Sequence, residues 1–236
     1  MTHPLDNPAW ASLTGPHAHL AEVRGAVRRY PADMSPFLAV GSEPSDADWD
    51  DIAALSGTGA VVSVAGATTS PPAGWEVVQV IPGVQMSGAA VFGAPDEEAV
   101  RLTAADVPEM LDLAGRTQPG PFLPRTIGLG TYLGIRRGGT LVAMAGERLH
   151  PPGWTEISAV CTDTAFRGQG LATRLVLAVA AGIRARGEIP FLHAAANNTG
   201  AIRLYESLGF SLRRRPSFNA LRVPANEVVS ASRTRP

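Results

Sequence analysis

The sequence predicts an α/β protein, and three observations support this fold class. Hydrophobic residues make up 45% of the 236 residues, which is enough for a sizeable core. Short runs with strand character alternate with stretches of helical periodicity along most of the chain. The stretch Trp154–Ala172, which reads WTEISAVCTDTAFRGQGLA, joins one strand to one helix through a glycine-rich turn. We expect the rest of the protein to be arranged around this last stretch.

The first part of this stretch has the pattern of a strand that ends near Thr162. Alternate side chains of an extended strand lie on the same face of a sheet. We therefore expect two sets of side chains on opposite faces, namely Glu156, Ser158 and Val160, and Ile157, Ala159 and Cys161.

The second part is a tight turn followed by a helix. The turn at residues 167–172 contains two glycines, and apolar residues then recur at helical spacing at Leu171, Leu175, Val179 and Ile183. A strand, a glycine turn and a helix N-terminus together direct free backbone N–H groups and a positive dipole end to one place. The stretch therefore predicts a phosphate-binding site.

Two familiar kinds of phosphate site do not fit. An NTPase P-loop needs a lysine on the terminal phosphates, and all 20 basic residues of this chain are arginines. A dinucleotide site needs a third glycine where Thr173 stands, and an acidic residue after the next strand. That strand, predicted at Ile189–Ala195, ends without a carboxylate, and Glu188 precedes it. Nucleoside triphosphates and dinucleotides are therefore disfavoured ligands.

The pattern Arg-x-x-Gly-x-Ala at residues 167–172 resembles the acyl-CoA pyrophosphate loop of the GNAT (Gcn-related) N-acetyltransferases. A second pattern at residues 198–210, Asn-x-x-Ala-x-x-x-Tyr-x-x-x-Gly-Phe, is similar to the last helix of that family and the strand after it. The resemblance covers about residues 99–222. It implies a mixed, mostly antiparallel sheet flanked by helices, with acetyl-CoA (coenzyme A) as the cofactor.

The resemblance assigns the cofactor contacts to three segments. Backbone N–H groups of the turn would hold the diphosphate, the end of the preceding strand would pair with the pantetheine arm, and the last helix would face the cofactor. Gly168 and Gly170 suit the turn, because a side chain would block close approach or forbid the backbone angles. The expected cofactor-binding residues are Val160, Cys161, Thr162, Arg167, Gly168, Gln169, Gly170, Leu171, Ala172, Thr173, Asn198 and Tyr205.

The resemblance also assigns three catalytic roles. The backbone N–H of Val160 would bind the thioester carbonyl oxygen at a strand bulge, and Tyr205 would protonate the leaving thiolate. Glu156, eleven residues before Arg167, stands at the offset of the catalytic glutamate in histone-type members of the family. A free carboxylate, with a pKa of about 4.3, is a weak base for an ammonium with a pKa of about 10.4. Glu156 would therefore need burial or an ordered water relay.

The assignments of Val160, Tyr205, Asn198 and Glu156 each have an alternative, and for Val160 it is an ordinary paired strand. Tyr205 fits a core position on the last helix, Asn198 fits an ordinary helix cap, and Glu156 fits an exposed strand position. His193, on the neighbouring strand, and Glu147 are rival candidates for the base. These alternatives stay open at the level of the sequence.

We expect three parts along the chain: an N-terminal α/β domain at residues 1–95, a GNAT acetyltransferase domain at 96–224, and a C-terminal tail at 225–236. A degenerate copy of the same fold is one interpretation of the first domain, although no Arg-x-x-Gly-x-Ala loop occurs in it. In the family, the region Gly115–Pro124 shapes the acceptor pocket. The elements predicted for the first domain are helices at 16–24 and 46–55 and strands at 37–40, 60–64, 75–81 and 84–91.

Charge is distributed unevenly. Residues 1–95 carry nine acidic side chains and three arginines, whereas residues 96–236 carry twelve acidic side chains and seventeen arginines. A basic half suits a ligand with three phosphate groups, as coenzyme A has. The run Arg213–Arg215 lacks the interleaved aromatic residues of a nucleic-acid site, so we expect a solvated strand edge near the 3′-phosphate of the cofactor. We expect no nucleic-acid partner, and a homodimer is left open.

The single cysteine, Cys161, excludes an internal disulfide and a multi-cysteine metal site, and we expect no metal. Cys161 is not a candidate nucleophile, because it lacks a convincing histidine partner and should face away from the cofactor. The first ten residues lack the basic and apolar parts of a secretory signal, and the longest apolar run, Leu175–Ile183, is too short to span a bilayer. We therefore expect a soluble, cytoplasmic protein without a membrane partner.

The sequence thus predicts an acetyl-CoA-dependent N-acetyltransferase in which an acceptor amine attacks the thioester directly. Neither a metal nor a covalent enzyme intermediate is expected. The alternative is a non-catalytic acyl-CoA-binding sensor or scaffold with the same fold. The acceptor amine and the preferred acyl chain depend on loop shapes, which the sequence does not predict.

Overall fold

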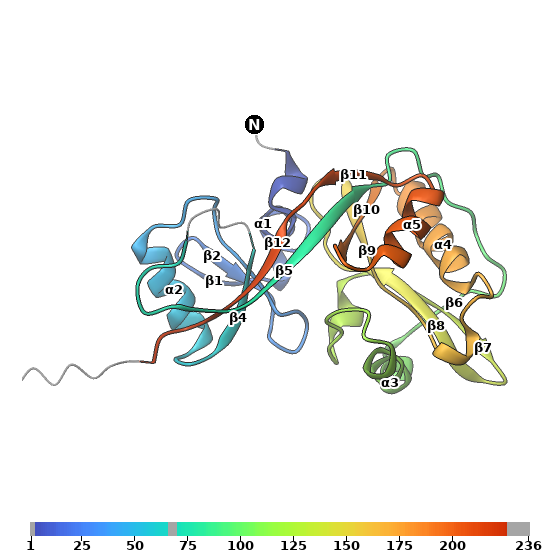
Figure 1. The fold of residues 1–236 in the computed structure, drawn as a ribbon, viewed down its shortest axis with the longest axis horizontal. Helices are drawn as coiled ribbons and strands as arrows, with labels where there is room; N and C mark the ends of the chain where they lie inside the picture. The colour runs from blue at the N-terminus through green and yellow to red at the C-terminus, as the bar shows by residue number, and fades with distance from the viewer. Residues whose placement is uncertain (1–2, 66–69, 226–236) are drawn as a thin grey trace, which may run out of the picture.

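The computed structural model describes residues 3–65 and 70–225. Its strands form one 12-stranded sheet in the order β1-β2-β3-β4-β12-β5-β10-β9-β8-β7-β6, and β11 pairs with β5 outside this path. Figure 1 shows two lobes that are bridged by the long strands β5 and β12. The strands are β1 (Glu22–Arg24), β2 (Val27–Arg29), β3 (Phe37–Ala39), β4 (Val61–Ala65), β5 (Glu76–Ser87), β6 (Val100–Arg101), β7 (Tyr132–Arg137), β8 (Thr140–Glu147), β9 (Trp154–Thr162), β10 (Ile189–Ala195), β11 (Ser211–Arg214) and β12 (Ser217–Arg222).

Helices of two kinds accompany the sheet within the described ranges. The α-helices are α1 (Pro8–Leu13), α2 (Asp46–Ser56), α3 (Val107–Thr117), α4 (Leu171–Ala185) and α5 (Thr199–Ser207). Short 3-10 helices lie at Pro4–Asp6, Ala18–Leu20, Ala104–Asp106, Thr126–Leu129 and Thr164–Phe166.

The N-terminal lobe contains α1, α2 and β1–β4, and α2, β3 and β4 lie where they are predicted. Ser45 starts α2, because its hydroxyl accepts from the backbone N–H of Asp48 while the Asp48 carboxylate accepts from the N–H of Ser45. The predicted helix at residues 16–24 is wrong. That stretch holds a 3-10 turn and β1, because Gly25, at a φ of 49°, turns β1 back onto β2.

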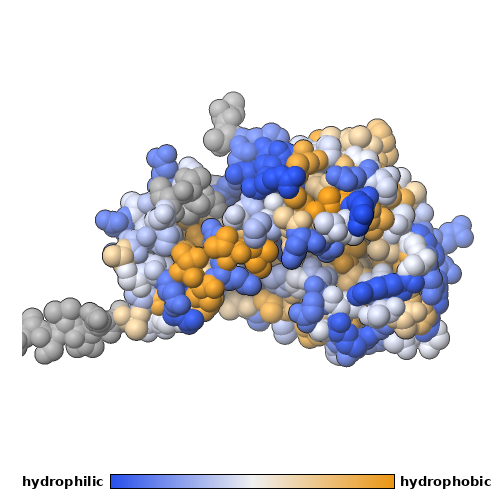
Figure 2. Space-filling model, in the orientation of Figure 1, coloured by the Kyte–Doolittle hydropathy of each residue, from blue (hydrophilic) through white to orange (hydrophobic). Residues whose placement is uncertain are grey.

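The long strand β5 differs most from the prediction. The sequence predicts two buried strands at 75–81 and 84–91, whereas the structure has one 12-residue strand whose first half is exposed. This half bridges the lobes beside β12, and the second half lies between β10 and β11. Figure 2 shows apolar surface gathered over the bridge, where the exposed residues are Val77, Val78, Val80 and Ile81. The domain boundary expected at residue 95 therefore does not separate two sheets, because strands from both sides of it belong to the same sheet.

The C-terminal lobe has the mixed, mostly antiparallel sheet that the sequence predicts. β7 and β8 form an antiparallel hairpin, β8 pairs antiparallel with β9, β9 pairs parallel with β10, and β10 pairs antiparallel with β5. α4 and α5 pack on one face of this sheet and α3 packs on the other (Figure 1). This arrangement confirms the predicted fold class.

The apolar face of α4 forms the main core of this lobe. Leu175, Val179 and Ile183, which have the predicted helical spacing, are buried against Ile157 of β9 and Leu192 of β10. Full burial of an aliphatic side chain of this size contributes about 1.5–3 kcal/mol to the stability. The helix that follows the glycine turn is therefore held firmly on the sheet.

Residues 93–98, which span the expected domain boundary, are docked against the C-terminal lobe. A Cβ atom on Gly93 would lie 2.3 Å from the backbone nitrogen of Ala181, so only glycine fits against α4 there. Asp96 accepts two hydrogen bonds, of 2.6 and 2.8 Å, from Arg174, and Glu98 accepts one of 2.7 Å from the same guanidinium. These contacts fix the start of α4 to the segment that leads into β6.

α4 is 15 residues long, and none of the helices in the described ranges has the length and apolar character to cross a bilayer. Within the same ranges, no group of three or more His, Cys, Asp or Glu side chains is placed to hold a metal ion. The predicted C-terminal tail, apart from Ala225, lies outside the described residues.

Candidate active site

Two parallel strands of the C-terminal lobe separate toward their C-terminal ends. The register between β9 and β10 runs from the pair Trp154–Ile189 to the pair Ile157–Leu192. Beyond these pairs β9 continues beside β8, and β10 continues beside β5. The sheet therefore splays between β9 and β10.

A bulge at Ala159 lies beside the splay. Three steps along β9, from Ser158 to Cys161, oppose two steps along β8, and Ala159 has a left-handed φ of 52°. The extra residue interrupts the alternation of side chains. Ile157 and Val160 both pack toward α4. Ala159 and Cys161 pack toward α3, so the predicted division of side chains between the two faces is wrong.

The glycine turn after β9 leads directly into α4. Gly168 and Gly170 have φ values of 78° and 74°, and no other atom lies within 4 Å of where a Cβ atom would stand on either residue. Both positions therefore need glycine for the backbone conformation and not for lack of space. Gly170 is the N-cap of α4, and no side chain caps the helix there. The first N–H groups of α4 have no intrahelical partner and are directed out of the helix end.

A groove of about 590 Å³ lies beside the splay. Its walls come from the end of β9, the glycine turn, the start of α4, one side of α5 and the C-terminal end of α3. The lining residues are Thr117, Gln118, Pro119, Val160, Cys161, Thr162, Phe166, Arg167, Gly168, Gly170, Leu171, Ala172, Thr173, Asn198, Ala201, Leu204 and Tyr205.

This groove brings together every predicted cofactor-binding residue except Gln169. The residues that the prediction misses include Thr117, Gln118 and Pro119, which end α3 and lie in the region expected to shape the acceptor pocket. Gln118 has a left-handed φ of 52°, which is uncommon for a residue other than glycine. No sequence signal marks a glutamine for this conformation, so these residues could not be placed from the pattern alone.

Two polar side chains that line the groove differ in their hydrogen bonding. The Thr162 hydroxyl oxygen is buried and has no hydrogen-bond partner. A buried hydroxyl without a partner is costly, so this position suits a ligand that hydrogen-bonds to it. The Asn198 side chain accepts from the backbone N–H of Ala201 at 3.2 Å and therefore acts as the cap of α5. The cap accounts for Asn198 without a ligand.

Tyr205 and Cys161 both line the groove. Burial, with a smaller contribution from Cys161, raises the pKa of Tyr205 to about 12. Burial also raises the pKa of the Cys161 thiol. Tyr205 belongs to the core under α4 and also lines the groove. A place in the core and a place in the site are therefore not mutually exclusive for this residue. Cys161 lines the groove as well, and the expectation that it faces away is wrong because the bulge reorients it.

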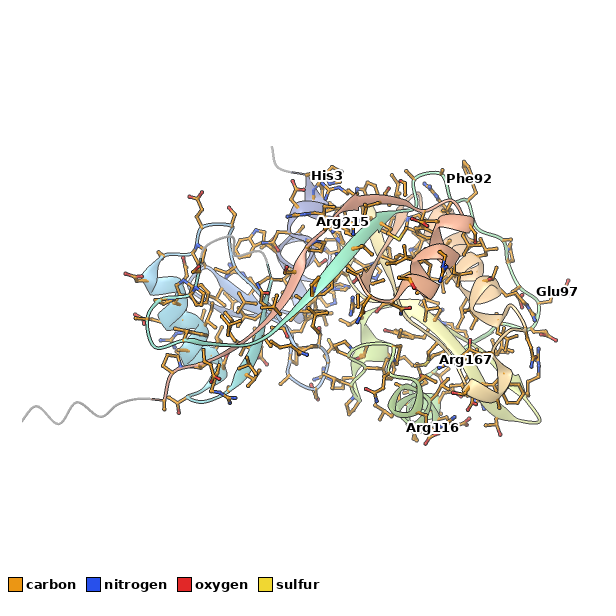
Figure 3. The ribbon with its side chains drawn as sticks, in the orientation of Figure 1. His3, Phe92, Glu97, Arg116, Arg167 and Arg215 are labelled. Carbon is orange, nitrogen blue, oxygen red and sulfur yellow. The ribbon has the colours of Figure 1, made fainter. Side chains whose placement is uncertain are left out.

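An ion pair links the two walls at the rim of the groove. Arg116 of α3 pairs with Asp163, the residue after β9, and also with Asp112 at 2.9 Å. Arg167, at the glycine turn, donates to the carbonyl oxygen of Thr162 at 3.3 Å. Figure 3 shows Arg116 on α3 and Arg167 beyond the end of β9, both toward the same end of the molecule.

Glu156 lies outside the groove and is fully buried. Its carboxylate accepts hydrogen bonds of 2.6 and 2.9 Å from Arg148, and His193 Nδ1 lies 2.7 Å from its Oε1 atom. Burial alone would raise the pKa of Glu156, but the charge and hydrogen bonds of Arg148, together with His193, outweigh it and lower the pKa to about 2. Glu156 is therefore not an exposed strand residue, and its lowered pKa makes it a weak base for an amine.

Glu147, the rival base, lies at the opposite end of α4 from the glycine turn. Its carboxylate accepts from Arg186 at 2.9 Å and from the backbone N–H of Thr131 at 3.1 Å. It lines a separate hollow of about 380 Å³, which it shares with His17 and His150. This position does not suit a base for chemistry in the groove.

The arginine run after α5 does not lie beside the glycine turn. Arg213 donates to Asp6 at 2.6 Å and to Gln85 at 2.8 Å, and Arg214 donates to the carbonyl oxygen of Asp6 at 2.8 Å. Figure 3 shows Arg215 next to the N-terminal segment and far from Arg167. The expected position near a 3′-phosphate is therefore wrong, because these arginines tie β11 to the N-terminal segment.

A splayed pair of parallel strands, a bulge beside the splay and a glycine turn before a helix define the class of N-acetyltransferase folds. A family model described as FR47-like protein matches residues 132–219. A GNAT-family protein of known structure from Novosphingobium aromaticivorans is 40% identical, with a TM-score of 0.86, over 95% of this chain and 100% of that chain. The chain belongs to the GNAT family.

Other relatives match a part of the chain or its fold alone. Over 90 residues, 36% of this chain, it is 40% identical to the N-alpha-acetyltransferase RimI of Mycobacterium tuberculosis, of which it covers 56%. Over 134 residues, 49% of this chain, it is 39% identical to the mycothiol acetyltransferase of Thermobispora bispora, of which it covers 43%. The chain thus spans about half the length of these curated relatives. A GCN5-related N-acetyltransferase from Kribbella flavida shares the fold at 17% identity, with a TM-score of 0.56 over 93% of this chain and 97% of that chain.

Proposed function

We propose that this protein is an acetyl-CoA-dependent N-acetyltransferase that moves an acetyl group from the thioester to an acceptor amine by direct attack. The observation that carries the proposal is the groove, which gathers an uncapped glycine turn, the bulged end of β9 and Tyr205. The similarity to an N-alpha-acetyltransferase and to a mycothiol acetyltransferase supports an amine as the acceptor.

The chain would hold coenzyme A along two stretches of backbone. The N–H groups from Arg167 to Thr173 would bind the diphosphate, because the helix end offers free donors and positive potential there. The end of β9, at Val160 and Thr162, would pair with the amides of the pantetheine arm. The unpartnered Thr162 hydroxyl fits this role, since an amide of the arm would complete its hydrogen bonding.

The backbone N–H of Val160 would donate to the thioester carbonyl oxygen as charge develops on it. The bulge at Ala159 supports this role, because it changes the direction of the chain just before Val160. Removal of one such donor from an enzyme costs about 2.7–4 kcal/mol of transition-state stabilisation. A backbone donor cannot be removed by a side-chain substitution, so the bulge is the feature to alter.

Tyr205 would donate to the leaving sulfur. Its pKa of about 12 keeps the phenol protonated through neutral pH, so the hydroxyl is always available as a donor. The same raised pKa makes complete proton transfer to a thiolate, whose ordinary conjugate pKa is about 8.5, uphill. Tyr205 therefore assists departure mainly through a hydrogen bond that strengthens as the carbon–sulfur bond breaks.

One observation favours a second candidate function, a non-catalytic acyl-CoA sensor. Glu156 and Glu147, two of the carboxylates considered as bases, are both held in ion pairs. A sensor needs the groove and the turn but needs no base. Both functions require binding of acetyl-CoA, so binding alone does not separate them.

Thiol release separates the two functions. Acetyl-CoA should raise the melting temperature in either case, because a ligand at 100 times its Kd adds about 2.7 kcal/mol of stability. An N-acetyltransferase releases free coenzyme A in the presence of one or more members of a panel of primary amines, and mass spectrometry identifies the acetylated amine. Binding of acetyl-CoA without release for any amine would support the sensor. Stabilisation by NAD and not by acetyl-CoA would refute both.

A further inference from the structure

His193 lies at the closed end of the splay. Leu192 forms the last pair between β10 and β9, and His193 is the next residue along β10. Leu192 and Ala194 pack in the core under α4 and α5, so the side chain of His193 points to the opposite face of the sheet. On that face it meets Glu156, which lies next to Ile157 at the last pair of β9.

The hydrogen bonds around His193 fix which ring nitrogen carries the proton. The Gln85 amide is oriented, because its oxygen accepts from Arg213 at 2.8 Å and its nitrogen donates to the carbonyl oxygen of Leu5 at 2.9 Å. The same amide nitrogen lies 3.0 Å from His193 Nε2, so it donates its second hydrogen there. Nε2 is therefore an acceptor, and Nδ1 carries the hydrogen that is donated to Glu156 at 2.7 Å.

We propose that His193 is the proton acceptor for the amine, with Glu156 and Arg148 as positioning residues behind it. A buried carboxylate that binds the Nδ1–H of a histidine leaves the Nε2 lone pair as the basic site, which is how Ser-His-Asp triads orient their histidine. The proposal rests on the acetyltransferase function proposed above and deepens it by naming the base.

The side chains of His193 and Glu156 differ in their exposure to solvent. The His193 side chain keeps 8% of its surface exposed, whereas the Glu156 side chain keeps none. Both oxygens of Glu156 are already bound by Arg148, and one of them also by His193. Of the two side chains, only that of His193 has exposed surface.

The neighbours of the ring come from five strands and one loop. The charged or polar ones are Glu156 of β9, Arg148 after β8, Gln85 of β5 and Arg213 of β11, which reaches the ring through Gln85. The rings of Phe191 and Phe218 pack against the imidazole at centroid distances of 5.7 and 5.6 Å.

In the proposed step, one bond to the thioester carbon forms and one breaks. The amine nitrogen forms a bond to the thioester carbon, one proton of the amine passes to His193 Nε2, and the carbon–sulfur bond breaks. The sulfur, which accepts a hydrogen bond from Tyr205, takes a proton from solvent, and His193 returns its proton to solvent. For this transfer the N–H of the amine replaces the N–H of Gln85 at Nε2.

The test compares His193→Asn with Glu156→Gln in the full-length protein, with the amine that gives turnover. Asparagine keeps an N–H donor near the position of Nδ1 for Glu156 and lacks the acceptor at Nε2. We expect His193→Asn to lower kcat about 10²–10⁴-fold, with the Kd for acetyl-CoA unchanged, and to remove the acidic limb of the pH profile of kcat/KM. His19→Gln, which removes an exposed histidine outside the groove, is the matched control and should retain the wild-type profile.

Glu156→Gln should lower kcat less and move the acidic limb to lower pH, because loss of the neighbouring negative charge disfavours the protonated ring. A merely structural role for Glu156 would leave the position of this limb unchanged. If His193→Asn keeps the wild-type kcat and limb while Glu156→Gln loses both, Glu156 is the base and the proposal is overturned. If both variants keep the limb, the proposal is overturned as well.

Failure of the proposed function gives a different result from failure of this inference. In the first case the wild-type protein releases no thiol with any amine, and in the second it turns over and His193→Asn does too. Nitrogen-15 spectra of the histidine rings supply a readout without turnover: the proposal requires His193 to carry its proton on Nδ1, and a proton on Nε2 would refute it. If His193→Asn does not fold, His193→Gln and these spectra carry the test.

Discussion

Arg148 binds the carboxylate of Glu156 through two hydrogen bonds of 2.6 and 2.9 Å, at a place where the Glu156 side chain has no exposed surface. The guanidinium also packs over the ring of Phe37, with 4.9 Å between its central carbon and the ring centroid. Because Phe37 belongs to the N-terminal lobe, this pair connects the two lobes. It also makes a glutamate at the expected sequence offset a weak base, because the pKa of Glu156 is lowered to about 2.

The first prediction concerns this pair and pH. Arg148→Met leaves the buried Glu156 carboxylate without its cationic partner and with only His193 beside it, which should lower the free energy of unfolding at pH 7 by about 3–5 kcal/mol. The pKa of Glu156 in the folded wild type is lowered to about 2, so its stabilising contribution is present above the unfolded pKa of about 4.3 and is lost as the pH falls toward 2. Urea denaturation at pH 7, 4 and 3 should therefore show the difference between wild type and variant shrinking with acidity.

Arg125→Met is the matched control for this prediction. Arg125 pairs with Asp33 at 3.2 Å, but both side chains are more than half exposed, so the loss should be at most about 1 kcal/mol. Equal losses for the two variants at pH 7 would contradict the energetic role of the buried pair.

The second prediction concerns Tyr205. Tyr205→Phe removes only the hydroxyl, so we expect kcat for thiol release to fall about 10–100-fold while the Kd for acetyl-CoA stays within about twofold. Steady-state kinetics and calorimetric titration measure the two quantities. Tyr132→Phe is the control, because the buried Tyr132 hydroxyl has no hydrogen-bond partner and its removal should leave activity unchanged. A Tyr205→Phe enzyme with wild-type kcat would remove Tyr205 from the mechanism.

The third prediction concerns the glycine turn. Gly170→Ala places a side chain on a backbone with a φ of 74° and should cost about 1–2 kcal/mol of stability, since space is free and only the backbone is strained. The same change should weaken acetyl-CoA binding at least tenfold if the turn relaxes away from this conformation. Gly182→Ala, within the last turn of α4 and also in free space, should instead stabilise the protein by about 0.5–1 kcal/mol. Thermal melts with and without acetyl-CoA measure both effects, and unchanged affinity in Gly170→Ala would argue against diphosphate binding at the turn.

The fourth prediction concerns the Thr162 hydroxyl. Thr162→Val keeps the shape of the side chain and removes a buried oxygen that has no partner, so the protein without ligand should be as stable as the wild type or more stable. If the hydroxyl binds the pantetheine arm, the affinity for acetyl-CoA should fall about 2–10-fold, as expected for one hydrogen bond of about 0.5–1.5 kcal/mol. Differential scanning fluorimetry and titration test the two halves separately. A variant with unchanged affinity would exclude a direct contact.

Much of the C-terminal lobe could be predicted from the sequence because its signals are local. A few consecutive residues are enough to predict the glycines of the turn, the apolar spacing of α4 and the Asn198 cap of α5. Each of these features lies where it is predicted. The groove follows from these elements, since the strand, the turn and the last helix meet beside the splay.

The predictions that are wrong concern residues whose contacts with distant parts of the chain override the local sequence pattern. No glycine in the sequence marks the bulge at Ala159. The bulge nevertheless places the side chains of Val160 and Cys161 on the faces of the sheet opposite to those predicted. The local pattern at Glu156 also fits an exposed strand residue, but Arg148 pairs with its carboxylate and packs in turn on Phe37 of the N-terminal lobe, so Glu156 is buried. Alternating or continuous apolar residues in β5 suggest burial, but half of that strand lies in an exposed bridge.

The route of β5 has a consequence for how such a protein can arise or be divided. This strand precedes residue 95 in the chain, yet it lies between β10 and β12 and completes the hydrogen bonding of both. A fragment that starts at residue 96 would leave β10 with an open apolar edge and should aggregate when it is expressed alone. A gene fusion or deletion that breaks the chain at that point would therefore give two unstable pieces, so the two halves of this molecule have to be inherited together.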